Sequence, residues 1–278
     1  MDLRTAITQG STLLEQGGIA VPRLTAEVLL AHAIGKERTY FYAHPEEELT
    51  ELGWIHYGRY LHQRLKRMPT QYITKKQEFY GRSFRVSPEV LIPRPETELL
   101  VETVLRLRPE ARALVDVGTG SGAIAVTLAL ELALEHVRAV YACDLSAGAL
   151  GMARGNAERL GALVRFAQGD LLGWCSDAAL DCVVSNPPYV ASADAPGMQR
   201  EVRDFEPHLA LFAGMSGLSI YERLVPEAWR VLQPGGLLAM EIGFGQSEAV
   251  MALTKDWHGV EAFADLAGIP RVIVCEKP

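Results

Sequence analysis

The sequence predicts an α/β fold, in which a doubly wound sheet follows a small all-α segment. From about residue 112 onward, short apolar runs alternate with stretches of helical pattern, which is typical of parallel strands joined by helical crossovers. A glycine-rich turn follows the first of these strands and opens a helix, as in open α/β sheets that bind ligands at the carboxyl ends of their strands.

Seven strands and four helices are expected in this part of the chain. The predicted strands are Ala113–Val117, Ala139–Cys143, Val164–Ala167, Cys182–Ser185, Leu237–Ile242, Val260–Phe263 and Val272–Cys275. The predicted helices are Ala123–Leu134, Gly148–Leu160, Leu218–Val231 and Ser247–Thr254. We expect the strands to run parallel, because strands and helices alternate along this part of the chain.

The segment before residue 74 predicts a small helical bundle. Pro22 suits the first turn of a helix that Gly35 would end, and a third helix is expected over Thr50–Met68. Residues 71–92 then hold β-prone pieces, which predict a hairpin linker around Gly81: Tyr72-Ile73-Thr74, Glu78-Phe79-Tyr80 and Ser83-Phe84-Arg85-Val86. We therefore expect a helical domain over residues 1–73, a β-hairpin linker and elbow over 74–100, and the α/β domain over 101–278.

The bulk composition is that of a soluble globular protein. The chain of 278 residues is 49% hydrophobic and 22% charged, and its net charge of −7 disfavours broad electrostatic binding to nucleic acid. Its beginning lacks the apolar core of a signal peptide, and its longest apolar stretch is too short to span a membrane. The four cysteines show neither Cys-x-x-Cys spacing nor a metal-like cluster, so we expect reduced thiols, a cytoplasmic location and no metal.

Positive charge is concentrated in residues 59–85, which carry a net charge of +7. This segment holds one acid, Glu78, and the basic residues Arg59, Arg64, Lys66, Arg67, Lys75, Lys76, Arg82 and Arg85. A solvated helix face and hairpin would explain it, and so would a docking patch for an acidic or RNA-rich partner.

Polar or glycine-rich loops follow each of the first four predicted strands. The first is the Gly-rich turn, residues 116–123, whose glycines 118, 120 and 122 allow a ligand to approach the backbone and the helix that follows. It also fits a dinucleotide fingerprint. Asp144 follows the second strand and suits either a ribose hydroxyl or the start of a helix. Asp170 and Leu171 follow the third strand, and they suit either the amine and face of an adenine or a simple turn.

The loop after the fourth strand is the most informative feature. Asn186-Pro187-Pro188-Tyr189, called here the Asn-Pro loop, cannot continue a strand, because neither proline has a backbone N–H. It combines an amide side chain, carbonyl acceptors and an aromatic ring on a stiff segment, which suits a flat –NH2 group. The alternative is that the two prolines only form a loop and that the tyrosine only packs against the protein.

This order of loops resembles the class I S-adenosylmethionine-dependent methyltransferases, and the Asn-Pro loop resembles the branch that methylates planar nitrogens. Further motifs are similar to one family, the peptide chain release factor glutamine N5-methyltransferases, also called the HemK or PrmC family. They are Pro69–Thr74, the elbow Leu91-Ile92-Pro93-Arg94-Pro95-Glu96-Thr97-Glu98, the loop Glu206–Gly214 and Glu241-Ile242-Gly243-Phe244-Gly245-Gln246. Departures from that family are Lys75-Lys76 in place of a glycine, Phe205 in place of a tyrosine, and Leu171 in place of an aromatic residue.

The resemblance implies a Rossmann-like seven-stranded methyltransferase sheet behind a helical substrate-docking domain. It implies methyl transfer from S-adenosylmethionine, with S-adenosylhomocysteine as product, to the glutamine N5 of the Gly-Gly-Gln motif of release factors, which modulates translation termination. The implied cofactor-binding residues are Gly118, Thr119, Gly120, Ser121, Gly122, Asp144, Asp170, Leu171 and Asn186. The implied catalytic residues, which also bind substrate together with Arg94, are Asn186, Pro187, Pro188 and Tyr189. Neither direct nucleic-acid binding nor a membrane is expected.

Three other enzymatic functions stay open at this point. A glutamine N5-methyltransferase acting on a ribosomal protein would use the same loop and differ in its docking region. A nucleobase amino-methyltransferase also acts on a planar amine, but the net charge and the missing recognition domain count against it. An NAD-dependent oxidoreductase would explain the Gly-rich turn and Asp144, yet it leaves the Asn-Pro loop without a role. A non-enzymatic binding module has the same weakness.

Overall fold

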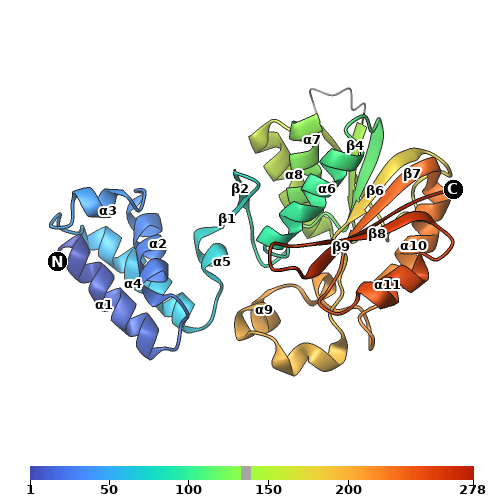
Figure 1. Cartoon of the computed structure of the whole chain (residues 1–278). Helices are drawn as coiled ribbons and strands as arrows, with labels where there is room; N and C mark the ends of the chain where they lie inside the picture. The colour runs from blue at the N-terminus through green and yellow to red at the C-terminus, as the bar shows by residue number, and fades with distance from the viewer. Residues whose placement is uncertain (133–138) are drawn as a thin grey trace. The chain divides into compact units, whose positions relative to one another are not determined.

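The computed structural model describes residues 1–132 and 139–278, which form two compact units (Figure 1). The first unit comprises residues 1–76 together with 199–205, and the second comprises 77–198 together with 206–278. The end of the helix predicted over Ala123–Leu134 lies outside the described residues. The domain boundaries expected at residues 73 and 100 stay a prediction.

The first unit is helical, as the sequence predicts. Its helices are α1 (Leu3–Gln16), α2 (Pro22–Ile34), α3 (Tyr40–Ala43), α4 (Glu51–Leu65), α5 (Thr70–Thr74) and α9 (Arg200–Phe205). Pro22 opens α2, and Gly35 ends it with a left-handed backbone at φ 66°. The core is apolar and includes Leu3, Leu14, Leu29, Leu30, Phe41 and Leu61. None of the helices in the described part of the chain combines the length and apolar content that a membrane span requires.

Two expectations for this unit are wrong. Residues 72–74 belong to helix α5 rather than to a strand, because the turn begins after Pro69 and ends at Lys75, whose backbone is left-handed at φ 59°. The third helix ends at Leu65 instead of Met68, because Lys66 ends its hydrogen-bond pattern and Arg67 has a φ of 73°.

The basic segment 59–85 is partly structural. Arg64 is buried, and its Nη2 donates to Glu201 Oε1 of α9 at 2.9 Å. Arg67 donates to the carbonyl oxygens of Gly17 and Gly18 at 3.0 Å. Arg59, Lys66, Lys75 and Lys76 remain exposed in this unit. Any docking role of the first unit's part of the segment therefore belongs to the exposed residues.

The second unit is built on the predicted seven-stranded sheet, in the order β5-β4-β3-β6-β7-β9-β8. The strands are β3 (Ala113–Val117), β4 (Ala139–Asp144), β5 (Val164–Gln168), β6 (Leu180–Ser185), β7 (Leu232–Glu241), β8 (His258–Ala264) and β9 (Pro270–Glu276). A small hairpin, β1 (Lys76–Phe79) and β2 (Arg82–Arg85), forms a separate two-stranded sheet.

The sheet is mixed, so the expectation of wholly parallel strands is wrong. Strands β5, β4, β3, β6 and β7 pair in parallel, whereas β9 runs antiparallel to both β7 and β8. The reason is the short connection between β8 and β9, which has no crossover helix and can join only antiparallel neighbours. Asp265 caps this turn, since its Oδ1 accepts the N–H groups of Ala267 and Ile269.

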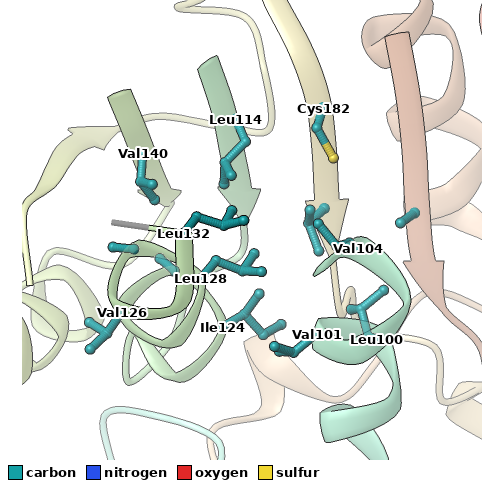
Figure 2. Close-up of a cluster of buried hydrophobic side chains, with 14 of the residues drawn as sticks. Leu100, Val101, Val104, Leu114, Ile124, Val126, Leu128, Leu132, Val140 and Cys182 are labelled. Atoms are coloured by element: carbon teal, nitrogen blue, oxygen red, sulfur yellow. The ribbon is translucent and has the colours of Figure 1, made fainter. Parts of the chain in front are cut away.

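Helices cover both faces of the sheet (Figure 1). Helices α6 (Glu98–Leu107), α7 (Ala123–Glu131) and α8 (Ala147–Leu160) pack on one face, and α10 (Ser219–Val231) and α11 (Ser247–Leu253) pack on the other. Figure 2 shows side chains of α6 and α7, such as Leu100 and Leu128, gathered against Leu114 and Cys182 of the strands. Alternate residues of each strand enter the two cores, because successive side chains point to opposite faces.

The order of strands places the ligand crevice. The chain crosses from one side of the sheet to the other between β3 and β6, which are neighbours although two strands, β4 and β5, lie between them in sequence. In open α/β sheets this switch point opens a crevice at the carboxyl ends of the strands. Short η1 (Pro95–Thr97), η3 (Ser192–Gly197) and η4 (His208–Ala210) helices lie in the connecting loops.

Asn156 of α8 joins the hairpin to the Gly-rich turn. Its Oδ1 accepts the Arg85 N–H at 2.8 Å, and its Nδ2 donates to the carbonyl oxygens of Arg85 and Ser121, each at 2.9 Å. The side chain is completely buried, so water does not take its place as the hydrogen-bond partner of these backbone groups.

We predict that Asn156→Ala lowers the free energy of unfolding by about 2–4 kcal/mol, because it leaves buried backbone groups unpaired. Urea unfolding followed by tryptophan fluorescence measures this change. The exposed Gln233 of the same unit provides the control, and Gln233→Ala should stay within about 0.5 kcal/mol of the wild type. Equal stabilities of the two variants would contradict the role given to Asn156.

Candidate functional site

One cavity lies at the carboxyl ends of β3, β4, β5 and β6, where the sequence places the candidate residues. Of these residues, Gly118, Gly120, Asp144, Asp170, Leu171, Asn186 and Pro188 line it. The elbow (residues 91–98) and the preceding residues add Pro88, Glu89, Val90 and Leu91, and the Glu206 loop (residues 206–214) adds Pro207, Leu209 and Ala210. Thr119, Ser121, Gly122, Pro187, Tyr189 and Arg94 are not among the lining residues.

The Gly-rich turn needs its glycines for two reasons. Gly118 and Gly120 have φ angles of 74° and 54°, which favour glycine, and a Cβ on either would meet no atom within 4 Å. The space beside their backbone is therefore open to a ligand. Gly122 has a φ of 81°, and a Cβ there would lie 3.1 Å from the Cβ of Ala153 in α8. Gly122 thus permits close packing of the turn against α8.

Asp116 fixes the shape of this turn from beneath. It is the penultimate residue of the buried strand β3, and its Oδ2 accepts the Thr119 hydroxyl at 2.6 Å and the Ala125 N–H at 3.1 Å. Its Oδ1 is buried without a hydrogen-bond partner among the described residues. Burial raises the pKa of Asp116 to about 7. Thr119 consequently faces the interior and supports the turn.

Asp144 connects the Gly-rich turn with the start of α8. Its Oδ2 accepts the Gly120 N–H, and its Oδ1 accepts the Ser146 N–H, both at 2.9 Å. The N-cap of α8 is Ser146, so helix capping does not account for Asp144. A carboxylate has about four acceptor positions, and Asp144 therefore keeps acceptors for hydroxyl groups of a ligand in the cavity.

The turn after β5 brings Asp170 and Leu171 to the cavity. Asp170 is exposed and pairs with Arg223 Nη2 at 2.6 Å. Leu171 has a φ of 49°, an unfavourable value for a bulky side chain, so the surrounding contacts must hold it there. Trp174 Nε1 donates to the Leu171 carbonyl at 3.0 Å, and Glu227 Oε2 accepts the N–H of the next residue, Leu172, at 2.8 Å.

The Asn-Pro loop is held at both ends. Asn186 Nδ2 donates to the hydroxyl of Thr97 at 3.1 Å, and the Tyr189 carbonyl accepts from Gln246 Nε2 at 2.9 Å. Pro187 is buried. Burial also raises the pKa of Tyr189 to about 12, so its phenol stays protonated at neutral pH.

Glu206 joins the elbow to the loop that bears its name. Its carboxylate is buried, and it accepts the Ile92 N–H at 3.2 Å and Arg94 Nη2 at 2.5 Å. The two segments that it joins supply opposite parts of the cavity lining, including Leu91 and Leu209. Arg94 therefore acts on the cavity wall through Glu206.

The cavity offers acceptors and apolar surface but lacks a strong base. Its titratable lining residues, all within the described part of the chain, are Glu89, Asp144, Asp170 and Cys143. Burial raises the pKa of the Cys143 thiol to about 12, so it is neutral and weakly nucleophilic. The arrangement suits the binding of hydroxyl and amine donors and the positioning of two reactants.

Four residues that shape the site have no role in the sequence-based prediction: Thr97, Asp116, Glu206 and Glu241. Asp116 and Glu241 carried a detectable signal, because each is an acid at the end of an otherwise apolar strand. Thr97 and Glu206 belong to motifs quoted above, but nothing in the sequence indicated their contacts, because their partners lie 89 and 114 residues away.

Two protein-family models match parts of this chain. Residues 5–74 match a model described as the PrmC N-terminal domain, and residues 95–202 match a model described as the methyltransferase small domain. A release factor glutamine methyltransferase from Koribacter versatilis is 47% identical over 100% of this chain and 99% of its own. Proteins of the same name from Moorella thermoacetica and Bacillus anthracis are 43% and 38% identical, covering 100% and 99% of this chain and 99% of each relative.

Solved structures share the fold of the second unit at lower identity. A methyltransferase from Pyrococcus furiosus aligns with a TM-score of 0.53 and 20% identity over 74% of this chain and 93% of its own. The T. thermophilus 16S rRNA N2 G1207 methyltransferase, solved with AdoMet and guanosine, aligns with a TM-score of 0.55 and 20% identity over 73% and 50% of the two chains. These likenesses confirm the Rossmann-like methyltransferase fold.

Asp116 should make stability depend on pH. Its folded pKa of about 7 exceeds the unfolded value of about 3.9, so its contribution is fully present below the unfolded pKa and is lost as pH rises through 7. Asp116→Asn cannot ionise, and we expect the variant to gain stability relative to the wild type between pH 5 and pH 8.

Urea unfolding of the two proteins at both pH values tests this expectation. The exposed Asp256 provides the control, because Asp256→Asn should leave the wild-type pH dependence unchanged. Parallel stability curves for the wild type and Asp116→Asn would show that Asp116 is not the group responsible.

Proposed function

We propose the function of this chain from one premise: it belongs to the release factor glutamine methyltransferase family. It transfers a methyl group from S-adenosylmethionine to the side-chain amide nitrogen, N5, of the glutamine in the Gly-Gly-Gln motif of peptide chain release factors. In this way it modulates translation termination. The observation that carries the proposal is whole-chain identity of up to 47% to proteins of that name, together with an Asn-Pro loop on the wall of the cavity.

The residues present fit S-adenosylmethionine. Gly118 and Gly120 leave open space beside the backbone, where a Cβ would otherwise project. Asp144 would accept the ribose hydroxyls of the cofactor, and Asp170 and Leu171 would take the amine and the face of its adenine. Thr119, Ser121 and Gly122 contribute through the shape of the Gly-rich turn, since their contacts are with Asp116, Asn156 and Ala153.

The difficulty of the reaction lies in the glutamine nitrogen. Its lone pair is delocalised into the amide carbonyl, which makes it a poor nucleophile. Bound S-adenosylmethionine supplies an electrophilic methyl group on a sulfonium. The protein supplies position: Asn186 Oδ1 and the Pro187 carbonyl accept the two N–H groups of the substrate amide, while Pro188 and Tyr189 hold its flat faces.

Positioning can account for the catalysis without a strong general base, because the methylated nitrogen is strongly acidic and releases its surplus proton to water. Holding two reactants in line removes orientational freedom before the reaction, which is worth several kcal/mol. The same acceptors stabilise positive charge that develops on the nitrogen. The protonated phenol of Tyr189 and the neutral thiol of Cys143 agree with this description, because neither is a base near neutral pH.

A release factor is a folded protein, so the substrate needs a docking surface beyond the cavity. The helical unit supplies it, and the exposed cations Arg59, Lys66, Lys75 and Lys76 suit an acidic partner. A cytoplasmic location and the absence of direct nucleic-acid contact stay predictions.

The alternatives are weaker. The relatives described above that match this chain over its whole length are all named release factor glutamine methyltransferase. The rRNA methyltransferase neighbour, at 20% identity, shares only the fold.

We expect purified protein and S-adenosylmethionine labelled in its methyl group to label a release factor at the glutamine of its Gly-Gly-Gln motif. Ribosomal protein, DNA and RNA, incubated in parallel, should remain unlabelled. A release factor with glutamate in place of that glutamine is the matched control and should also remain unlabelled. Label confined to ribosomal protein or nucleic acid would refute the proposed substrate.

Asn186→Ala should abolish methyl transfer, because it removes the acceptor that holds the substrate amide. Its affinity for S-adenosylhomocysteine should change no more than a few-fold, since the Gly-rich turn and Asp144 are intact. Calorimetric titration measures that affinity, and the labelling assay measures transfer. Near-normal turnover in this variant would exclude Asn186 from the reaction.

A further inference from the structure

The Asn186 side chain can serve as an acceptor only if its amide is held in one orientation. An amide presents an oxygen acceptor on one side and an –NH2 donor on the other. A rotation of half a turn would place the –NH2 of Asn186 against the –NH2 of a substrate amide, and two donors cannot bond. The orientation must therefore come from what the Asn186 –NH2 contacts on the side away from the cavity.

That contact is Thr97, at the junction of η1 and α6. Asn186 Nδ2 donates to Thr97 Oγ1 at 3.1 Å, and Thr97 is buried at 4% exposure. A hydroxyl has one hydrogen to donate and can accept as well. Since Thr97 accepts from Asn186, its own hydrogen must go to another acceptor.

Glu241 interacts with both Thr97 and Asn186, and its carboxylate can take this hydrogen. It lies at the end of β7 and is buried at 3% exposure. Hydrogen bonds from Thr97 and Asn186 lower the pKa of Glu241, against a larger effect of burial that raises it to about 7. A carboxylate only accepts hydrogen bonds, and a protonated carboxyl still has a carbonyl oxygen that accepts. Glu241 therefore gives the hydrogen bonds a direction.

The other carboxylate oxygen of Glu241 gains no hydrogen bond from its burial, so the burial does not stabilise the fold through that atom. Glu241 Oε2 is buried without a hydrogen-bond partner among the described residues. An unpaired buried polar atom costs free energy, and such costs are found where a site requires a particular chemistry. The carboxylate is thus better explained by the residues that it orients than by the stability of the sheet.

We propose that Thr97 and Glu241 are positioning residues that hold the Asn186 amide with its oxygen toward the cavity. Thr97 accepts from Asn186 Nδ2, and Glu241 lies beside both residues, which leaves Oδ1 as the group presented to the substrate. The proposal rests on the function proposed above. It adds that the acceptor character of the Asn-Pro loop depends on two residues outside the loop.

Thr97→Val tests the proposal, because it removes the hydroxyl while keeping a β-branched side chain. We expect kcat for release factor methylation, at saturating S-adenosylmethionine, to fall by about 10- to 100-fold. The affinity for S-adenosylhomocysteine should stay within two-fold of the wild type. Thr97→Ser restores the hydroxyl and should recover kcat to within about three-fold; Thr97→Ala serves in place of Thr97→Val if that variant does not fold.

Thr127→Val is the matched control. Thr127 of α7 is also buried, and its hydroxyl has no partner among the described residues, so its loss should leave kcat unchanged. A kcat for Thr97→Val within two-fold of the wild type, or a serine variant as impaired as the valine variant, would overturn the proposal. Failure of the wild type itself to methylate the release factor would instead refute the proposed function.

Discussion

The site depends on the adjacency of β3 and β6 at the point where the strand order reverses. Val117 is in register with both Cys143 and Ser185, so three strands end at the same level of the sheet. Ser185 Oγ donates to the Val117 carbonyl at 2.7 Å, which ties the ends of β3 and β6 together. Because the Gly-rich turn follows Val117 and the Asn-Pro loop follows Ser185, this register sets the two loops side by side across one crevice.

Buried carboxylates then hold the loops in place. Asp116 fixes the Gly-rich turn, Glu206 joins the elbow to the Glu206 loop, and Glu241 lies behind Asn186. Burying a charge is costly unless it is paired or hydrogen-bonded, and within the described residues Asp116 and Glu241 each retain an oxygen without a partner. Their burial therefore favours a precise arrangement of loops over maximal stability, as is common where strain is kept at functional sites.

The sequence predicts those features that depend on local residue patterns and on the order of the loops, such as the strands and the cavity-lining loops. Strand β3 matches its expected bounds residue for residue, because an apolar run between a polar segment and a glycine turn has one plausible reading. Strand β7 begins five residues earlier than expected, since Pro234 and two glycines suggest a turn. Helix α5 was mistaken for a strand because a five-residue stretch shows too little periodicity. The contacts of Thr97 and Glu206 were invisible, because only the tertiary fold brings their partners near.

The chemistry of the cavity wall explains why it should distinguish glutamine from glutamate. Pro188 of the wall has no N–H, and Asn186 turns its –NH2 toward Thr97, so this part of the wall presents acceptors. A neutral amide –NH2 satisfies two such acceptors. A carboxylate would bring further acceptors against them, leaving buried oxygen atoms unpaired, and such mismatches give strong discrimination. On the proposal made above, the selectivity resides in the direction of a few hydrogen bonds, which is fixed by residues that need not contact the substrate.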